Sequence, residues 1–284
     1  MEATLQLVEC PRDAMQGWKS FIPTTDKIRY LNLLLKAGFH TLDFGSFVSP
    51  KYIPQMADTA LVLEKLKPSP TQLLAIVANL RGAQDAVQHQ RIRYLGFPFS
   101  VSETFQQRNT HSSREEALHT VEEIEKLCRQ TGKELVVYMS MGFGNPYGDP
   151  YSAEILASWT AKIHALGVRI ISLADTVGMA TPDQVYQAVH HLRPAFPDTI
   201  FGVHLHATPS GLEEKLNAAL DAGCIRIDGA VGGIGGCPMA DDELVGNMNT
   251  SAILKVLEQR GLYTGIDMHF FQEAELLSNQ IFVS

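Results

Sequence analysis

The chain has 284 residues, of which 45% are hydrophobic and 19% are charged, values that are ordinary for a globular protein. A domain of this length buries about three quarters of the surface of its unfolded chain, so its core needs no disulfides. The net charge of −8 without a basic cluster argues against nucleic acid as a partner, and no apolar run reaches the length of about 18 residues that a membrane helix requires.

The N-terminus and the cysteines bear on the compartment. Residues Met1–Thr4 lead directly into a strand-like run without a basic segment, which predicts that a secretory signal is absent. The cysteines, Cys10, Cys128, Cys224 and Cys237, lie far apart and form no C-x-x-C pair. This spacing argues against a zinc ribbon or a disulfide framework, and it indicates a reducing compartment. We therefore expect a cytoplasmic protein.

A short apolar or β-branched run followed by a longer stretch of helical period recurs at intervals of about 25 to 40 residues. The predicted strands, in chain order, are Leu5–Glu9, Thr41–Phe44, Leu73–Ala78, Arg93–Phe97, Glu134–Met139, Arg169–Ala174, Thr199–Leu205 and Ile225–Ala230. The predicted helices include Thr25–Ala37, Arg114–Thr131, Ser152–Leu166, Pro182–His190, Gly211–Ala222 and Thr250–Arg260.

Eight alternating units without a linker favour a closed parallel barrel over an open doubly wound sheet. The doubly wound alternative is weakened because no G-x-G-x-x-G follows the first strand, and because the glycine-rich stretch 232–236 lacks the Lys-Ser/Thr of a phosphate loop. The tail Leu262–Ser284 contains several large apolar residues and is expected to form a helix that packs on the barrel or on a second subunit. The predicted fold is α/β, a single (β/α)8 TIM-barrel catalytic domain over 1–284 with a short C-terminal helical extension.

In barrel enzymes the residues that carry the chemistry lie at the C-terminal ends of the strands. Several predicted strand ends here carry charged or reactive side chains. These are Arg12 and Asp13 after the first strand, Asp43 in the second, Asp175 after the sixth, His204 and His206 at the seventh, and Cys237 and Asn247 in the loop after the eighth.

The pair His204 and His206 suggests a metal site. Residues two apart in a strand face the same side, about 6.6 Å apart along the chain, so both imidazoles can reach one cation at about 2.1 Å. An isolated H-x-H is more often a cap or a hydrogen-bonded pair in the interior. Barrel closure, however, places Asp13, both histidines and Asn247 on three adjacent strands. Mixed nitrogen and oxygen ligands suit a six-coordinate Mn²⁺ or Mg²⁺ better than a closed zinc site.

The neighbouring residues each have two readings. Arg12 either pairs with Asp13 on the surface, which stabilises little, or stabilises a developing enolate oxygen at the barrel mouth. Cys237 is either an inert buried thiol or, with an unperturbed pKa of about 8.5, a proton donor in a glycine loop. Asp43 and Asp175 are either inward-facing supports or direct participants.

At these residues the chain resembles the HMG-CoA (3-hydroxy-3-methylglutaryl-CoA) lyase branch of the DRE-TIM metallolyases. The resemblance spans about residues 5 to 265, and its S-F-V-S-P-K and G-G-C-P elements are specific to this branch. The stretches that carry it are Pro11–Gln16, Ser46–Lys51, Pro54–Asp58, Ser100–Glu103, Ala174–Gly178, His204–His206, Gly235–Ala240 and Gly246-Asn247.

The resemblance implies a role for each matching residue. It implies that the metal ligands are Asp13, His204, His206 and Asn247. It implies that Arg12 stabilises the enolate and that Cys237 lies on a mobile catalytic loop. It further implies that Tyr138, Asp43 and Asp175 are active-site polar groups, with His204 also a candidate base, and that Lys19 and Gln16 lie near the acyl-CoA. Three departures concern the acyl group more than the metal: Asp43 stands where the family commonly has Glu, Ala207 where it has Asp, and the loop from Cys237 to Asn247 is one residue longer.

We therefore expect a divalent-metal-dependent lyase that cleaves HMG-CoA, or a close 3-hydroxyacyl-CoA, to acetyl-CoA and acetoacetate by retro-Claisen chemistry. One alternative is a Claisen-condensing acyltransferase like the isopropylmalate and homocitrate synthases, which usually carry a further C-terminal region and lack the G-G-C-P loop. Another is a non-catalytic barrel that senses metal or acyl-CoA. We expect a homo-oligomer, with a dimer favoured, and no nucleic acid or membrane partner; leucine breakdown and ketone formation both remain open as pathways.

Overall fold

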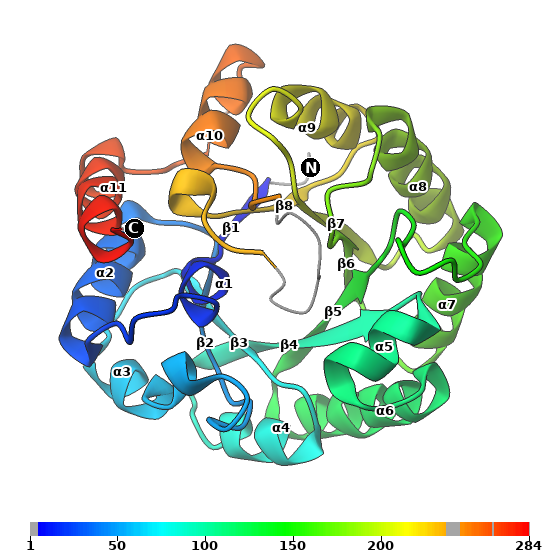
Figure 1. The fold of residues 1–284 in the computed structure, drawn as a ribbon, viewed down its shortest axis with the longest axis horizontal. Helices are drawn as coiled ribbons and strands as arrows, with labels where there is room; N and C mark the ends of the chain where they lie inside the picture. Colours follow the sequence, from blue (N-terminus) through cyan, green and yellow to red (C-terminus); the bar gives the residue numbers. More distant parts are fainter. Residues whose placement is uncertain (1–4, 237–244, 263, 284) are drawn as a thin grey trace.

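The computed structural model describes residues 5–236, 245–262 and 264–283. Eight parallel strands form a closed barrel in the order β1 to β8, with the helices around its outside (Figure 1). The ring closes where β1 pairs with β8, with Val8 in register with Asp228. The predicted TIM barrel is therefore confirmed, and the two ends of the sheet meet beside each other.

The strands are β1 (Gln6–Glu9), β2 (Thr41–Ser46), β3 (Gln72–Ile76), β4 (Ile92–Ser100), β5 (Glu134–Ser140), β6 (Ile170–Asp175), β7 (Ile200–Leu205) and β8 (Arg226–Gly229). The helices are α1 (Pro11–Gln16), α2 (Thr24–Ala37), η1 (Pro54–Met56), α3 (Thr59–Lys65), α4 (Leu80–Val87), α5 (Glu103–Thr110), α6 (Arg114–Thr131), α7 (Ala153–Ala165), α8 (Pro182–Ala195), α9 (Leu212–Asp221), η2 (Val231–Gly233), α10 (Thr250–Gln259) and α11 (Met268–Ile281).

The predicted strands and helices are all present, and their ends agree within three residues except at α8. That helix continues to Ala195, so its predicted end at His190 is wrong. Val185, Val189 and Leu192 are buried at helical spacing, which keeps the last turns packed on the barrel. The short helices α1, α3, α4, α5, η1 and η2 were not expected, because elements of three to eight residues give no measurable helical period.

Local signals fix where the longer helices begin. At α6 the Ser113 side chain accepts a hydrogen bond from the Glu116 amide, and the Glu116 side chain accepts one from the Ser113 amide. Thr181 and Gln184 form the same reciprocal pair at the start of α8. Gly38 ends α2 with φ of 86°, a conformation that costs a glycine little. These capping residues set where the helices begin and end relative to the neighbouring strands.

The apolar residues form two layers, one on each side of the strands. On β5, Leu135, Val137 and Met139 face the helices and belong to the large outer core. Val136 and Tyr138 alternate with them and belong to a smaller cluster inside the barrel. Polar side chains occupy the barrel interior toward the C-terminal ends of the strands, where the candidate site lies.

The C-terminal tail forms α11, which packs on α2 within the same chain (Figure 1). Phe271 is fully buried, and its ring meets that of Phe39 edge-on at 6.1 Å. Phe282 meets Trp18 edge-on at 5.3 Å, next to the α1 segment. The helix therefore covers the barrel beside β1 and supports the segment that carries Arg12 and Asp13.

No helix in the described part of the chain combines the length and the apolar character needed to cross a bilayer.

Candidate active site

Three of the predicted metal ligands converge at the C-terminal end of the barrel. Potential ligand atoms of Asp13, His204 and His206 all lie within 4.8 Å of one another. Asp13 lies in α1, directly after β1, and the two histidines lie in and just after β7. Because His204 and His206 are two residues apart in an extended segment, their rings face the same side, with centroids 5.5 Å apart.

The fourth predicted ligand, Asn247, joins this group through Asp13. Its Nδ2 donates to Asp13 Oδ2 at 2.7 Å and to the Ile234 carbonyl at 3.0 Å. Asn247 also forms an antiparallel bridge with His206, so the segment after β8 is held along the end of β7. All four predicted ligands therefore lie together, although Asp13 and Asn247 are separated by 234 positions in the chain.

Two features of this corner fit a divalent cation. A Cβ on Gly235 would lie 2.5 Å from Asn247 Nδ2 and 2.9 Å from Asp13 Oδ2, so only glycine leaves room beside these two polar atoms. The Nδ1 of His206 is buried and has no hydrogen-bond partner among the described residues. A carboxylate, an amide and two imidazoles around a space kept clear by glycine match the ligand preferences of Mg²⁺ or Mn²⁺.

The electrostatics put these groups in forms that can bind a cation. Burial alone would raise the pKa of Asp13, but Arg12, His204 and the Asn247 hydrogen bond lower it below its ordinary value. Burial and the nearby His204 lower the pKa of His206 to about 4, so its ring is neutral at neutral pH. Cations bind ionised carboxylates and neutral imidazoles, so both states are favourable.

Arg12 lies between two carboxylates. Its Nη2 donates to Asp43 Oδ2 at 2.6 Å, its Nε contacts both Asp43 oxygens at 3.0 and 3.2 Å, and its Nη1 donates to Asp13 Oδ1 at 2.9 Å. The residue is 8% exposed, so the surface ion pair considered from the sequence is wrong: the pair forms, but it is buried. Burial raises the pKa of Asp43 to about 6, against the opposing effect of Arg12.

Asp175 has a cationic partner that was not predicted. Lys215 on α9 donates to Asp175 Oδ2 at 2.8 Å, to the His206 carbonyl at 2.8 Å and to the Gly178 carbonyl at 3.2 Å. This lysine ties the ends of β6 and β7 together behind the histidines. The sequence contains a signal for it, because Lys215 stands on the buried face of α9 next to Leu216.

Tyr138 lies inside the barrel, and its ring stands nearly perpendicular to that of His204, at a centroid distance of 5.8 Å and an interplanar angle of 84°. Its hydroxyl is buried without a hydrogen-bond partner among the described residues, and burial raises its pKa well above the ordinary value. The structure therefore brings Tyr138 next to a predicted ligand, as expected.

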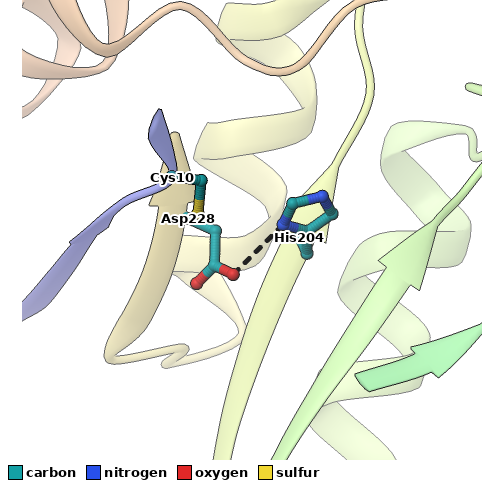
Figure 2. A group of neighbouring side chains, drawn as sticks. All are labelled: Cys10, His204 and Asp228. Carbon is teal, nitrogen blue, oxygen red and sulfur yellow. Dashed lines mark hydrogen bonds and ion pairs between the residues drawn. The ribbon is translucent and has the colours of Figure 1, made fainter. Parts of the chain in front are cut away.

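Two residues beside His204 were missed from the sequence. Asp228 Oδ2 on β8 lies at hydrogen-bond distance from His204 Nδ1, 3.1 Å away, and Cys10 lies next to Asp228, directly after β1 (Figure 2). Burial alone would lower the pKa of His204, but the hydrogen bond and charge of Asp228 raise it. The signal was the barrel register: Gly202 pairs with Arg226, so His204 and Asp228 occupy the next inward position on adjacent strands.

The remaining predicted residues are Gln16, Lys19 and Cys237. Gln16 donates to Asp13 Oδ1 at 2.9 Å, so it contacts the proposed ligand group directly. Lys19 is exposed in the segment after α1. Cys237 lies outside the described residues.

Comparisons with known proteins identify the family. The family model HMGL-like matches residues 5–277. The chain is 33% identical to the mitochondrial hydroxymethylglutaryl-CoA lyase of Bos taurus over 93% of this chain and 81% of that protein, and 32% identical to the cytoplasmic 3-hydroxy-3-methylglutaryl-CoA lyase of Rattus norvegicus over 93% and 77%.

Solved structures show the same likeness. An HMG-CoA lyase from Acinetobacter baumannii in complex with coenzyme A and 3-methylmalate superposes with a TM-score of 0.91 at 30% identity, covering 98% of this chain and 91% of that one. A hydroxymethylglutaryl-CoA lyase from Pseudomonas aeruginosa gives a TM-score of 0.92 at 29% identity, covering 99% and 94%.

Proposed function

The chain belongs to the HMGL-like family and is an enzyme of the hydroxymethylglutaryl-CoA lyase type, and we propose that it cleaves HMG-CoA, or a close 3-hydroxyacyl-CoA, to acetyl-CoA and acetoacetate. The observation that carries this proposal is the convergence of Asp13, His204 and His206, with Arg12 hydrogen-bonded to the same carboxylate. A cationic side chain next to a cation site suits a reaction that develops negative charge on oxygen.

Asp13, His204, His206 and Asn247 would hold a divalent cation, with Mg²⁺ or Mn²⁺ favoured by the mixed oxygen and nitrogen ligands. When bound, such a cation supplies Lewis-acid polarisation of the substrate oxygens and fixes their orientation. Gln16 contacts Asp13 and so belongs to the cation end of the site. The exposed Lys19 is then the better candidate for the phosphates of coenzyme A.

The proposed cleavage begins with removal of the proton from the 3-hydroxyl of the substrate. The electron pair of that O–H bond becomes the carbonyl of acetoacetate, and the C2–C3 bond breaks with its electron pair passing to the acetyl-CoA fragment. Arg12 would stabilise the resulting enolate oxygen, and Cys237 would return a proton to C2. Both products then balance the substrate without another reactant.

Asp43 is the favoured proton acceptor among Asp43, Asp175 and His204. His204 belongs to the proposed ligand set. Both carboxylates already accept hydrogen bonds, Asp175 from Lys215 and the Ala180 amide and Asp43 from Arg12, so hydrogen bonding does not distinguish them. Asp43 has a pKa raised to about 6 by burial, near the range in which a general base works best at neutral pH.

The proposal is tested by incubating the purified chain with HMG-CoA and following acetoacetate release with Mn²⁺, with Mg²⁺ and with EDTA. We expect release with either cation and its loss with EDTA. A screen of other 3-hydroxyacyl thioesters then defines the acyl group. Condensation of acetyl-CoA with a 2-oxo acid in place of cleavage would support a synthase, and no turnover of any thioester would overturn the lyase.

Arg12→Lys tests the role of the arginine. Lysine keeps the charge but cannot contact Asp43 and Asp13 together, because it lacks the forked donors of the guanidinium. We expect kcat to fall by about 10²- to 10³-fold, the usual effect of losing a charge-stabilising donor, with Mn²⁺ affinity retained. An unchanged kcat would remove Arg12 from the mechanism.

Compartment and assembly stay predictions. The relatives include mitochondrial and cytoplasmic proteins, and we propose the cytoplasm from the sequence. Cell fractionation tests the compartment, and light scattering on the purified chain tests the proposed homodimer.

A further inference from the structure

The carboxylate of Asp228 is buried next to His204, a partly buried residue of the predicted cation site. Asp228 is 1% exposed, and its Oδ2 lies 3.1 Å from His204 Nδ1 (Figure 2). His204 comes from β7 and Asp228 from the neighbouring β8, so both ends of the contact are fixed by the barrel sheet. The contact therefore has little freedom to change without moving a strand.

We propose that Asp228 is a positioning residue, which holds the ring of His204 with Nδ1–H donated to it and thereby leaves Nε2 to the cation site formed with Asp13 and His206. This inference rests on the proposed function only in its use of that cation site. The role acts through His204, because His204 is the proposed ligand that Asp228 contacts.

The chemistry of the pair fixes the tautomer. An ionised carboxylate can only accept a hydrogen bond, so the ring nitrogen that faces it must carry the proton. In a neutral imidazole the other nitrogen then has the lone pair that a cation needs. The second ring nitrogen lies on the far side of the ring from Asp228 (Figure 2). Such carboxylate–histidine pairs behind metal ligands fix ring orientation and raise ligand basicity.

Other contacts limit the ring to this orientation. The centroid of the Tyr138 ring lies 5.8 Å from that of His204, and the centroid of the His206 ring lies 5.5 Å from it. Among the described residues, Asp228 alone forms a hydrogen bond with the His204 side chain. Loss of that acceptor would free the tautomer while leaving the ring in place.

Cys10 suggests an alternative role for His204 and Asp228. Potential ligand atoms of Cys10, His204 and Asp228 also lie within 4.8 Å of one another, so this triad could itself take a thiophilic cation (Figure 2). That role needs a thiolate, whereas burial and then the nearby Asp228 and Asp43 raise the pKa of the Cys10 thiol well above its ordinary value and so favour the neutral thiol. We therefore assign Asp228 to positioning and use Cys10 as the control.

The test compares Asp228→Asn with Cys10→Ser in the full-length protein. Mn²⁺ binding is measured by electron paramagnetic resonance titration, without substrate. We expect Asp228→Asn to weaken Mn²⁺ binding by about 10- to 100-fold, the usual loss when such a partner of a metal ligand is changed. Cys10→Ser should leave the affinity unchanged. Equal affinity in Asp228→Asn and wild type would overturn the proposal.

A second measurement does not depend on the Asp228 variant: the tautomer is read in the wild-type protein, and a variant serves only to assign the signal. Long-range ¹H–¹⁵N spectra of the metal-free wild-type protein report the tautomer of His204, assigned by its loss in His204→Gln. We expect the Nδ1–H form, and an Nε2–H form would overturn the proposal. A Co²⁺ titration completes the test: a thiolate-to-cobalt absorption band that disappears in Cys10→Ser would show that the triad is itself a metal site and would also overturn it.

These readouts separate the inference from the proposed reaction. If no hydroxyacyl thioester is cleaved but Asp228→Asn still loses Mn²⁺, the lyase proposal fails and the positioning role stands. If cleavage is observed and Asp228→Asn binds Mn²⁺ normally, the lyase proposal stands and the positioning role fails.

Discussion

Single residues set the shape of the site, and Gly235 does so most directly. Its φ of +112° lies in a region that residues with a side chain rarely adopt. Asp13 and Asn247 lie close to it on the side where a Cβ would stand. A backbone that passes this close keeps the carboxylate and the amide together. The glycine is thus part of the geometry of the proposed cation site.

Gly235→Ala should therefore separate Asp13 from Asn247 and lower both Mn²⁺ affinity and kcat. Gly132→Ala is the matched control, because Gly132 also has a positive φ of +68° but nothing within 4 Å of the added Cβ, and it lies before β5. We expect the control to lose only about 1 kcal/mol of stability from backbone strain. Mn²⁺ affinity equal in both variants would contradict this role of Gly235.

Glu9 is a buried acid at the end of β1 that the proposed reaction does not use. Its carboxyl group accepts hydrogen bonds from the Val231 amide at 2.8 Å and the Thr250 hydroxyl at 2.6 Å. Burial raises its pKa to about 8, against the effect of these two hydrogen bonds. The folded protein therefore binds a proton here that the unfolded chain, with a pKa of 4.5, has already released at neutral pH.

This difference predicts a pH-dependent stability. The contribution of protonated Glu9 is complete below pH 4.5 and is lost as the pH rises through about 8. The free energy of unfolding of wild type should fall relative to that of Glu9→Gln by up to about 1.4 kcal/mol per pH unit in this window. Urea unfolding across the pH series measures it, with the exposed Glu258→Gln as control. A constant difference between wild type and Glu9→Gln would argue against a buried neutral Glu9.

Among the elements, α11 shows how a tail becomes part of the barrel. Its buried face carries Phe271 and, three, six and seven positions later, Ala274, Leu277 and Ser278, and this face lies on α2. The opposite face leaves Leu276 65% exposed. The helix therefore depends on packing against α2 for its stability.

Phe271→Ala should destabilise the protein by about 3 to 5 kcal/mol, because it removes a fully buried ring and leaves a cavity between α11 and α2. Leu276→Ala, on the exposed face of the same helix, should change stability by less than about 0.5 kcal/mol. Chemical denaturation of the two variants measures both. A large loss for Leu276→Ala would show that the exposed face is covered in the assembled protein.

For the whole molecule, closure of the barrel is what makes the site possible. β1 pairs with β8, and the segment after β8 returns to the end of β7, so Asp13 and Asn247 meet across nearly the full chain. A cation bound there would link the first and last parts of the fold. It would bind the folded state and not the unfolded chain, in which these residues are far apart.

Mn²⁺ should therefore raise the unfolding temperature in a concentration-dependent way, by the equivalent of about 2.7 kcal/mol at about 100 times its dissociation constant. Scanning calorimetry with and without EDTA measures this. Asp13→Ala should abolish the Mn²⁺-dependent rise in the unfolding temperature. In EDTA the unfolding temperatures of wild type and Asp13→Ala should differ only by the effect of the lost side-chain contacts of Asp13. A shift that persists in Asp13→Ala would place the cation elsewhere.

The sequence predicted the barrel because each strand and each long helix has its own period, and caps such as the Ser113–Glu116 pair depend on residues three apart. It also predicted that Asp13, His204, His206 and Asn247 meet, since closure of eight parallel strands dictates which strand ends are neighbours. The sequence predicted that the side chains of His204 and His206 face the same side, because alternation along a strand is a local property.

What only the tertiary structure decided is how side chains from different elements contact one another. The buried Arg12–Asp43 pair, the reach of Lys215 to Asp175 and the Asp228 carboxylate behind His204 depend on register, tilt and rotamers across the barrel. Local periodicity does not specify these quantities, because the same pattern of apolar and polar residues is compatible with many side-chain directions. The sequence by itself therefore determined the helices and strands, their order and the residue types of the site. The closed barrel determined which charged side chains contact one another within it.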